Sequence, residues 1–293
     1  MKVSNISPRM FKAYYSLTKP GIIRGNLISL TAGFLLASKT DINIVLFIAL
    51  IIGTSLIIAS GSVFNNVIDR KIDLKMDRTK KRATATGKVS PASAYIFASL
   101  LGIVGVIVLD VWVNLITVAV GLFGLFAYVV LYGFAKRKSI HGTLVGSISG
   151  ATPPVAGYVA VTGNFDLASA ILFLILDFCQ MPHFYAISIF RSNDYKNAGL
   201  PVMPVKKSVM NTKIQVLAYI VVFTFVAPLL SISGYAGKTY LIIACILGLG
   251  WFYYGASYLK SLASDAWARK MFGLSLIVLL VICFTISVDS MLP

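Results

Sequence analysis

Long apolar stretches alternate with short polar segments along the whole chain. A helix needs about 20 predominantly apolar residues to cross a bilayer. The pattern therefore predicts nine transmembrane helices, with ends uncertain by several residues. The predicted spans are residues 21–38, 43–66, 92–109, 112–134, 143–162, 167–190, 212–232, 239–259 and 271–289.

Two of these spans carry residues that are unfavourable in lipid. The first contains Arg24 and Asn26, and the fifth contains Pro153 and Pro154. A charged side chain or a broken helix is tolerated at membrane depth when it faces protein or a water-filled cavity. We therefore expect both spans to face the interior of the helix bundle.

Composition agrees with an integral membrane protein. Of the 293 residues, 58% are hydrophobic and only 12% are charged, whereas about a quarter of the residues in a soluble domain are charged. No linker or low-complexity segment interrupts residues 1–293, so we expect a single intramembrane domain. Within the segment 1–20, apolar and basic side chains alternate at helical spacing over 8–19, which indicates a short interfacial helix on the cytoplasmic side that ends before Pro20.

Positive charge is concentrated between the spans. The chain has 26 Lys and Arg against 10 acidic residues, for a net charge of +16. All of these cations except Lys39 and Lys238 fall on one side of the predicted membrane, which places the N-terminus in the cytoplasm and the C-terminus on the opposite side of a cell inner membrane. The cations form no soluble basic domain, so we expect no nucleic-acid partner, but they can attract an anionic substrate or membrane lipids.

The acidic residues are clustered in one loop. Asp69, Asp73 and Asp77 follow the second span four residues apart, and Asn65 precedes them at the same interval. If the helix continues, Asn65, Asp69 and Asp73 share one face. One interpretation is a solvated charged face, compensated by the adjacent cations Arg70, Lys71, Lys75 and Arg78. The other is a magnesium site, because Mg²⁺ prefers oxygen ligands and is often held by one or two carboxylates together with substrate phosphates.

Basic side chains next to the aspartates fit the second interpretation. Arg78, Lys80 and Arg82 lie within the same loop and can bind phosphate oxygens. Asp194 is the one acid in a second loop predicted on the same side. Two such loops facing each other can hold a diphosphate between them. Taken alone, Asp194 is equally well explained as a helix cap or a turn residue.

Ionisable side chains also occur inside the sixth span. Asp177 and His183 lie there, His183 directly after Pro182. Intramembrane ionisable residues are candidates for function because they are costly in lipid. For His183 the sequence leaves open a structural hydrogen bond, an acceptor-site contact, a proton relay and an axial metal ligand.

At these residues the sequence resembles the UbiA-type intramembrane prenyltransferases. The Asn65-Asp69-Asp73 spacing is similar to the first aspartate motif of that family. Further segments resemble the branch of the family that farnesylates heme. They are YYSLTKP (14–20), NNVIDRKID (65–73), MDRT (76–79), YGFAKRKS (132–139), GSISGATPPVAGYVAVTG (146–163), QMPHFYAI (180–187) and DYKNAGLPVMPV (194–205).

The resemblance implies an all-α fold with about nine transmembrane helices around a central cavity. It implies farnesyl diphosphate and heme B as substrates, Mg²⁺ as cofactor, and heme O and diphosphate as products. Downstream partners would be a heme A synthase or a terminal oxidase. By resemblance, Asp69 and Asp73 are catalytic and, with Asn65 and Asp194, bind the metal–diphosphate. The further diphosphate contacts would be Arg78, Lys80, Arg82 and Lys136, and His183 would serve the heme.

Two departures from the family pattern affect these expectations. Ala198 stands where the wider family often has a second aspartate after Asp194, which puts a second fully liganded metal in doubt. Cys179 stands where the heme branch often has tryptophan. The alternative functions are prenylation of another acceptor, such as a quinone precursor, and secondary transport, although no inverted repeat of the kind found in many transporters is evident.

Overall fold

The computed structural model describes residues 8–260 and 263–289, and every element within them is helical. Nine helical segments in this part of the chain are long and apolar enough to span a membrane. Six are single helices: α2 (Pro20–Ser38), α3 (Ile44–Ile68), α5 (Pro91–Trp112), α10 (Leu167–Phe190), α15 (Lys238–Ser257) and α16 (Ser264–Asp289).

The other three spans are built from consecutive shorter helices. Leu115–Lys138 comprises α6 (Leu115–Phe126), a π-helical turn (Ala127–Leu131) and α7 (Tyr132–Lys138). Gly142–Thr162 comprises α8 (Gly142–Gly150) and α9 (Thr152–Thr162), and Val209–Ile232 comprises α13 (Val209–Val226) and α14 (Leu229–Ile232). Short helices lie outside the spans: α1 (Pro8–Leu17), α4 (Arg70–Asp73), α11 (Ser192–Asn197) and α12 (Met203–Lys206).

The all-α fold with nine candidate spans confirms the prediction from the hydrophobic pattern. The largest difference in bounds is at the last span, which begins at Ser264 and not at 271. Its first turns carry Asp265, Arg269 and Lys270, so the helix continues into a polar segment that a hydropathy pattern excludes. A helix is held by backbone hydrogen bonds and does not end where the apolar side chains end.

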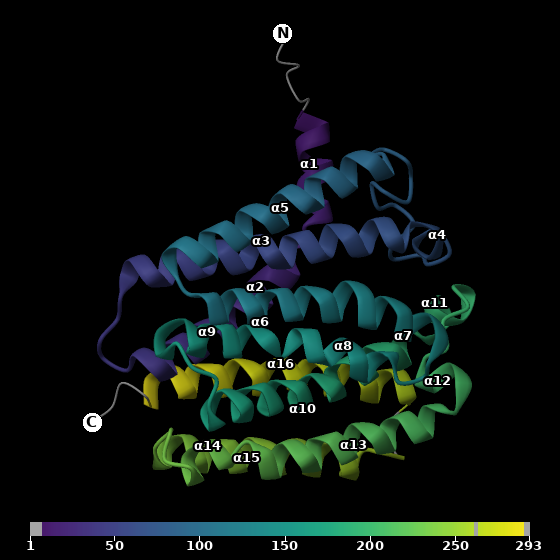
Figure 1. Cartoon of the computed structure of the whole chain (residues 1–293). Coiled ribbons are helices and arrows are strands. Elements are labelled where there is room, and N and C mark those ends of the chain that lie inside the picture. Colours follow the sequence, from purple (N-terminus) through teal and green to yellow (C-terminus); the bar gives the residue numbers. More distant parts are fainter. Residues whose placement is uncertain (1–7, 261–262, 290–293) are drawn as a thin grey trace.

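The spanning helices run roughly side by side, and α4, α11 and α12 lie together at one end of the bundle (Figure 1). α2 and α9 pack closely against each other at glycines. A Cβ atom on Gly33 would overlap the carbonyl of Pro154, and one on Gly157 would overlap the carbonyl of Leu30. Small residues at such crossings allow the two backbones to approach, which is the usual basis of helix association in membranes.

The two spans that carry residues unfavourable in lipid differ in how far these residues are buried. Pro153 and Pro154 are buried and begin α9 after the break at Ala151, as expected for a span that faces protein. Asn26 is half-buried on the first span, but Arg24 is exposed, so the prediction that it faces the interior of the bundle is wrong. Arg24 lies in the second turn of α2, where a long side chain can extend to the membrane surface.

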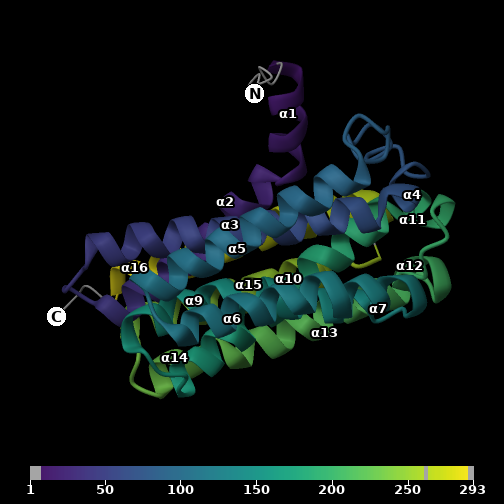
Figure 2. The same cartoon turned by 45° about the horizontal axis from the view of Figure 1, so that its top comes forward.

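The helix α1 confirms the short helix predicted before Pro20, and Figure 2 shows it projecting away from the bundle. Leu17 at its end is buried, whereas Phe11 and Tyr15 are exposed and stack on each other with ring centroids 6.4 Å apart. The chain then turns at Lys19, which has a left-handed φ of 52°. The interfacial placement of α1 stays a prediction, supported by these two exposed aromatic rings.

Candidate active site

A cavity of about 850 Å³ lies between α2, α3, α7, α8 and α10 and reaches the loops around α4 and α11. Most of its wall is apolar, and its polar groups come from segments far apart in the sequence. The polar side chains that line it are Lys19, Asn26, Thr54, Ser62, Asn65, Asp69, Asp73, Arg78, Arg82, Tyr128, Tyr132, Lys136, Ser139, Thr143, Ser149, Thr152, Gln180, His183, Ser188, Arg191 and Tyr195.

The aspartate motif lines this cavity. α3 ends at Ile68, but helical hydrogen bonds continue through α4: the N–H of Asp69 donates to the carbonyl of Asn65 at 2.9 Å, and that of Asp73 to the carbonyl of Asp69 at 2.8 Å. Asn65, Asp69 and Asp73 therefore share one face, as their spacing predicted. Their exposed fractions are only 6%, 7% and 1%.

Cations from outside the immediate motif compensate these buried carboxylates. Arg82 binds both oxygens of Asp73 at 2.9 Å. Asp69 pairs with Lys136 and with Arg137, the latter at 2.7 Å. The interpretation as a solvated charged face is wrong, because both carboxylates are buried and the adjacent Arg70 donates to a backbone carbonyl.

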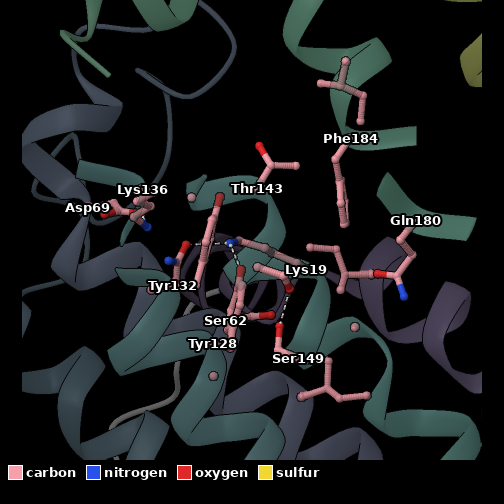
Figure 3. Close-up of a pocket in the computed structure, with 18 of the residues that line it drawn as sticks. Lys19, Ser62, Asp69, Tyr128, Tyr132, Lys136, Thr143, Ser149, Gln180 and Phe184 are labelled. Carbon is pink, nitrogen blue, oxygen red and sulfur yellow. Dashed lines mark hydrogen bonds and ion pairs between the residues drawn. The ribbon is translucent and has the colours of Figure 1, made fainter. Parts of the chain in front are cut away.

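Lys19 joins the aspartate motif from the start of α2, a contact that the sequence did not indicate. Its Nζ donates to Oδ1 of Asn65 at 3.2 Å and to the hydroxyl of Tyr128 at 3.3 Å (Figure 3). Burial, followed by the nearby charge of Arg82, lowers the pKa of Lys19 to about 7. A binding partner with negative charge would favour its protonated form.

The remaining predicted phosphate contacts are divided between the cavity and its outer rim. Arg78 lines the cavity together with Arg82 and Lys136. Lys80 lies outside it and pairs with Asp77 at 2.6 Å, and both side chains are largely exposed. Asp194 accepts a hydrogen bond from the N–H of Asp77 at 3.3 Å, so it links the two loops without lining the cavity.

Aromatic and imidazole side chains form the opposite wall, from α10 and α16. His183 lines the cavity, its Nδ1 lies 2.8 Å from the hydroxyl of Ser275, and its ring is 4.6 Å from that of Phe272. Asp177 does not line the cavity. It is buried and accepts a hydrogen bond from Ser147 at 2.6 Å, which joins α8 to α10.

Several residues at the site were not identified from sequence. Besides Lys19, these are Arg137, Tyr128 and Tyr132, the last two with rings 5.8 Å apart. The segment YGFAKRKS contains Arg137 next to Lys136, but adjacent cations on a helix point in different directions and the sequence does not show that both reach Asp69. Tyr128 and Tyr132 lie within an apolar span, and nothing in the sequence indicates that they line a site.

The geometry defines a class of protein: an intramembrane protein with a cavity that combines a cluster of cations and carboxylates at one end with a largely apolar interior. The model of the UbiA prenyltransferase family matches residues 26–277. This chain belongs to the UbiA prenyltransferase family and is a prenyltransferase, which confirms the resemblance and makes the secondary-transporter alternative wrong.

Individual relatives agree with this assignment. The chain is 48% identical to a protein named protoheme IX farnesyltransferase from Citrobacter koseri, over 97% of this chain and 96% of that protein. A solved digeranylgeranylglyceryl phosphate synthase matches with a TM-score of 0.79 at 21% identity, covering 96% of this chain and 98% of the other. A UbiA homologue from Archaeoglobus fulgidus bound to GPP and Mg²⁺ matches with a TM-score of 0.71 at 12% identity, over 94% and 99%.

Proposed function

We propose that this protein transfers the farnesyl group of farnesyl diphosphate to a vinyl group of heme B, giving heme O and diphosphate. The observation that carries the proposal is the near full-length match, at 48% identity, to the protoheme IX farnesyltransferase of C. koseri. The cavity is consistent with both substrates, since it combines a charged end with a large apolar interior. The product would pass to a heme A synthase or a terminal oxidase in the same membrane.

The donor atoms at the charged end fit a magnesium–diphosphate. Asn65, Asp69 and Asp73 present amide and carboxylate oxygens to one side of the cavity, and these are the hard ligands that Mg²⁺ prefers. The A. fulgidus homologue is bound to Mg²⁺ and GPP. When bound, Mg²⁺ would neutralise the charge that develops on the leaving diphosphate.

The cations that now bind the carboxylates are placed to bind phosphate oxygens instead. Arg82, Lys136 and Lys19 each contact a residue of the aspartate motif, and Arg78 lines the cavity beside them. If the metal occupied the carboxylates, these side chains would be free to bind the diphosphate and to stabilise its negative charge as it leaves. Lys80 and Asp194 do not line the cavity. They can contact the diphosphate only if their loops move toward the cavity.

The remaining wall excludes water from the allylic carbon and positions the acceptor. The C1–O bond of farnesyl diphosphate breaks and diphosphate leaves with the electron pair. The terminal vinyl carbon of heme forms the new C–C bond, and water adds its oxygen to the inner vinyl carbon with loss of a proton. The apolar lining limits premature capture of the allylic cation by water.

Incubation of the purified protein with heme B, farnesyl diphosphate and Mg²⁺, followed by mass analysis of the extracted heme, tests the function. We expect a heme that carries one hydroxylated farnesyl group. Aromatic quinone precursors serve as competing acceptors in the same assay. Prenylation of a quinone precursor with no change in the heme would identify a different acceptor.

His183 provides a second test, because it lies on the wall opposite the aspartates. His183→Ala should weaken heme binding or slow turnover about tenfold or more, since it removes a polar contact to the acceptor. Affinity for a non-hydrolysable farnesyl diphosphate analogue should stay within twofold. Heme absorbance titration and analogue binding to the same purified variant measure the two effects.

Ser275→Ala is the matched control for His183. It removes the hydrogen-bond partner of Nδ1 but keeps the imidazole. If His183 serves only to bond Ser275, the two variants should behave alike. Loss of diphosphate binding with normal heme binding in His183→Ala would reverse the assignment.

We propose further that the aspartate loops face the cytoplasm, with the C-terminal end of α16 on the opposite side of the inner membrane. The motive is the concentration of cations on the loop side. Single cysteines at the exposed Lys88 and Lys207 should be protected from a membrane-impermeant thiol reagent in intact cells, and a cysteine at the exposed Asp41 should react. The native Cys245 is replaced by alanine in all three. Labelling at Lys88 or Lys207 would mean that the orientation is reversed.

A further inference from the structure

Near the junction of α10 and α11, two arginines that form no salt bridge within the described part of the chain lie close to one aromatic ring. The guanidinium carbon of Arg191 lies 5.8 Å from the ring centroid of Phe190, and that of Arg269 lies 4.9 Å from the same centroid. Arg191 follows the last residue of α10, and Arg269 comes from the second turn of α16. Among the described residues neither arginine forms a salt bridge.

A continuous series of contacts connects this pair to the interior of the cavity. The ring of Phe190 meets that of Phe272 edge to face at 5.8 Å, and Phe272 lies 4.6 Å from the ring of His183 at an interplanar angle of 35°. Arg191, Phe190, Phe272 and His183 all line the cavity. Along this wall the side chains change from cationic to aromatic to imidazole.

These arginines differ from the cations at the aspartate wall. Arg82, Lys136 and Arg137 are paired with buried carboxylates in the same cavity. Arg191 and Arg269 lie within cation–π distance of an aromatic ring, and in the described part of the chain no carboxylate pairs with them. The planar fork of an arginine near an aromatic ring can still bind a carboxylate through two parallel hydrogen bonds.

We propose that Arg191 and Arg269 form a carboxylate subsite that binds the acidic edge of a planar aromatic acceptor. This inference rests on the proposed function, in which the acidic edge is the pair of propionates of heme B. The guanidinium groups bind the carboxylates at the mouth, and the ring system lies along Phe272 and His183. The subsite thereby fixes which edge of the acceptor enters the cavity, so it determines orientation and selects acceptors that carry carboxylates.

Anionic groups can also reach these arginines from the membrane, because both side chains are exposed. A phospholipid phosphate has the same charge as a carboxylate and binds arginine by similar hydrogen bonds. The two sources differ in one measurable respect: only an acceptor carboxylate is removed by esterifying the acceptor.

The test combines arginine variants with esterified acceptor. Arg191→Gln and Arg269→Gln are titrated with heme B and with its propionate dimethyl ester, by absorbance, in a neutral detergent. The wild type should bind heme B more tightly than the ester. Each variant should lose about tenfold in affinity for heme B, as for one hydrogen bond to a charged group, and should bind the ester as the wild type does. Arg191→Lys should recover part of the loss.

Lys270→Gln is the matched control, because Lys270 is exposed and adjacent to Arg269 on α16, whereas the cations found over the Phe190 ring among the described residues are Arg191 and Arg269. Its binding of both porphyrins should equal that of the wild type. All titrations are repeated in nanodiscs of phosphatidylcholine with and without phosphatidylglycerol. A loss in the Arg variants that appears only with phosphatidylglycerol, and equally for heme and ester, would assign the arginines to lipid and overturn the proposal.

The proposed function and the carboxylate subsite are contradicted by different results. If the wild type binds neither porphyrin and leaves heme unchanged in the transfer assay, the proposed function is wrong. If the wild type farnesylates heme but the Arg variants discriminate heme from its ester as well as the wild type does, the function stands and the carboxylate subsite is wrong.

Discussion

Asp69→Asn and Asp73→Asn should each lower the rate of farnesyl transfer by roughly 100-fold or more. Each replacement removes a negative oxygen ligand from the proposed metal site while keeping the size of the side chain. Asp73 is 1% exposed and Asp69 is 7% exposed, so neither is a surface charge whose loss water can compensate. The measurement is turnover at saturating Mg²⁺, with binding of a farnesyl diphosphate analogue measured with and without the metal.

Asp77→Asn is the matched control for these variants. Asp77 continues the four-residue spacing from Asp73, but its side chain is 80% exposed and pairs with Lys80 outside the cavity. Its turnover should stay within a few-fold of the wild type. Each variant is also checked by size-exclusion chromatography, because asparagine leaves the cations around it uncompensated. Near-normal turnover of Asp69→Asn or Asp73→Asn in folded protein would contradict the metal assignment.

Gly157→Val should destabilise the folded protein by about 1–3 kcal/mol or more, as overpacking of a tight contact does. A Cβ atom at this position of α9 would overlap the carbonyl oxygen of Leu30 and lie 2.8 Å from the backbone nitrogen of Phe34. Both are backbone atoms of α2, so no side chain can rotate away and the helices must separate. The expected result is a lower midpoint of thermal unfolding in detergent and a lower yield of monodisperse protein.

Gly250→Val on α15 is the control, since an added Cβ there would meet no atom within 4 Å. It carries the same loss of helix propensity without the clash. Gly157→Val should also reduce turnover of the fraction that remains folded, because α2 begins directly after Lys19 and its displacement moves that side chain from Asn65. Equal unfolding midpoints for the two variants would show that the contact between α2 and α9 is not limiting for stability.

The sequence determined the number and type of the helices and one face of the site. Nine apolar stretches of spanning length admit few structures other than a helical bundle, since lipid offers no partner for free backbone groups. The four-residue spacing of Asn65, Asp69 and Asp73 placed three oxygen donors on one face, because helical periodicity is local. The ends of the helices were less certain, as the start of α16 at Ser264 shows.

The sequence does not show which of several neighbouring cations binds a buried carboxylate. Arg82 and Lys80 lie in the same loop, yet Arg82 binds the buried Asp73 while Lys80 binds the exposed Asp77. Between α4 and α5 the chain forms turns without a helical or strand period, so there is no repeat from which to read the direction of a side chain. Asp177 and His183 share one helix, but their separation is not a multiple of the helical turn, and only His183 reaches the cavity.

Only the tertiary structure decided which distant residues complete the site. Lys19 reaches Asn65 across 46 positions of sequence, and Lys136 reaches Asp69 across 67. These pairs depend on how α2 and the π-helical turn before α7 pack against α3. The position of α2 depends in turn on its close backbone approach to α9, where Gly157 meets Leu30, and hydrophobic periodicity does not encode that approach. Local spacing thus determined which donors act together on one helix, whereas the long-range packing of the bundle determined which charges they meet.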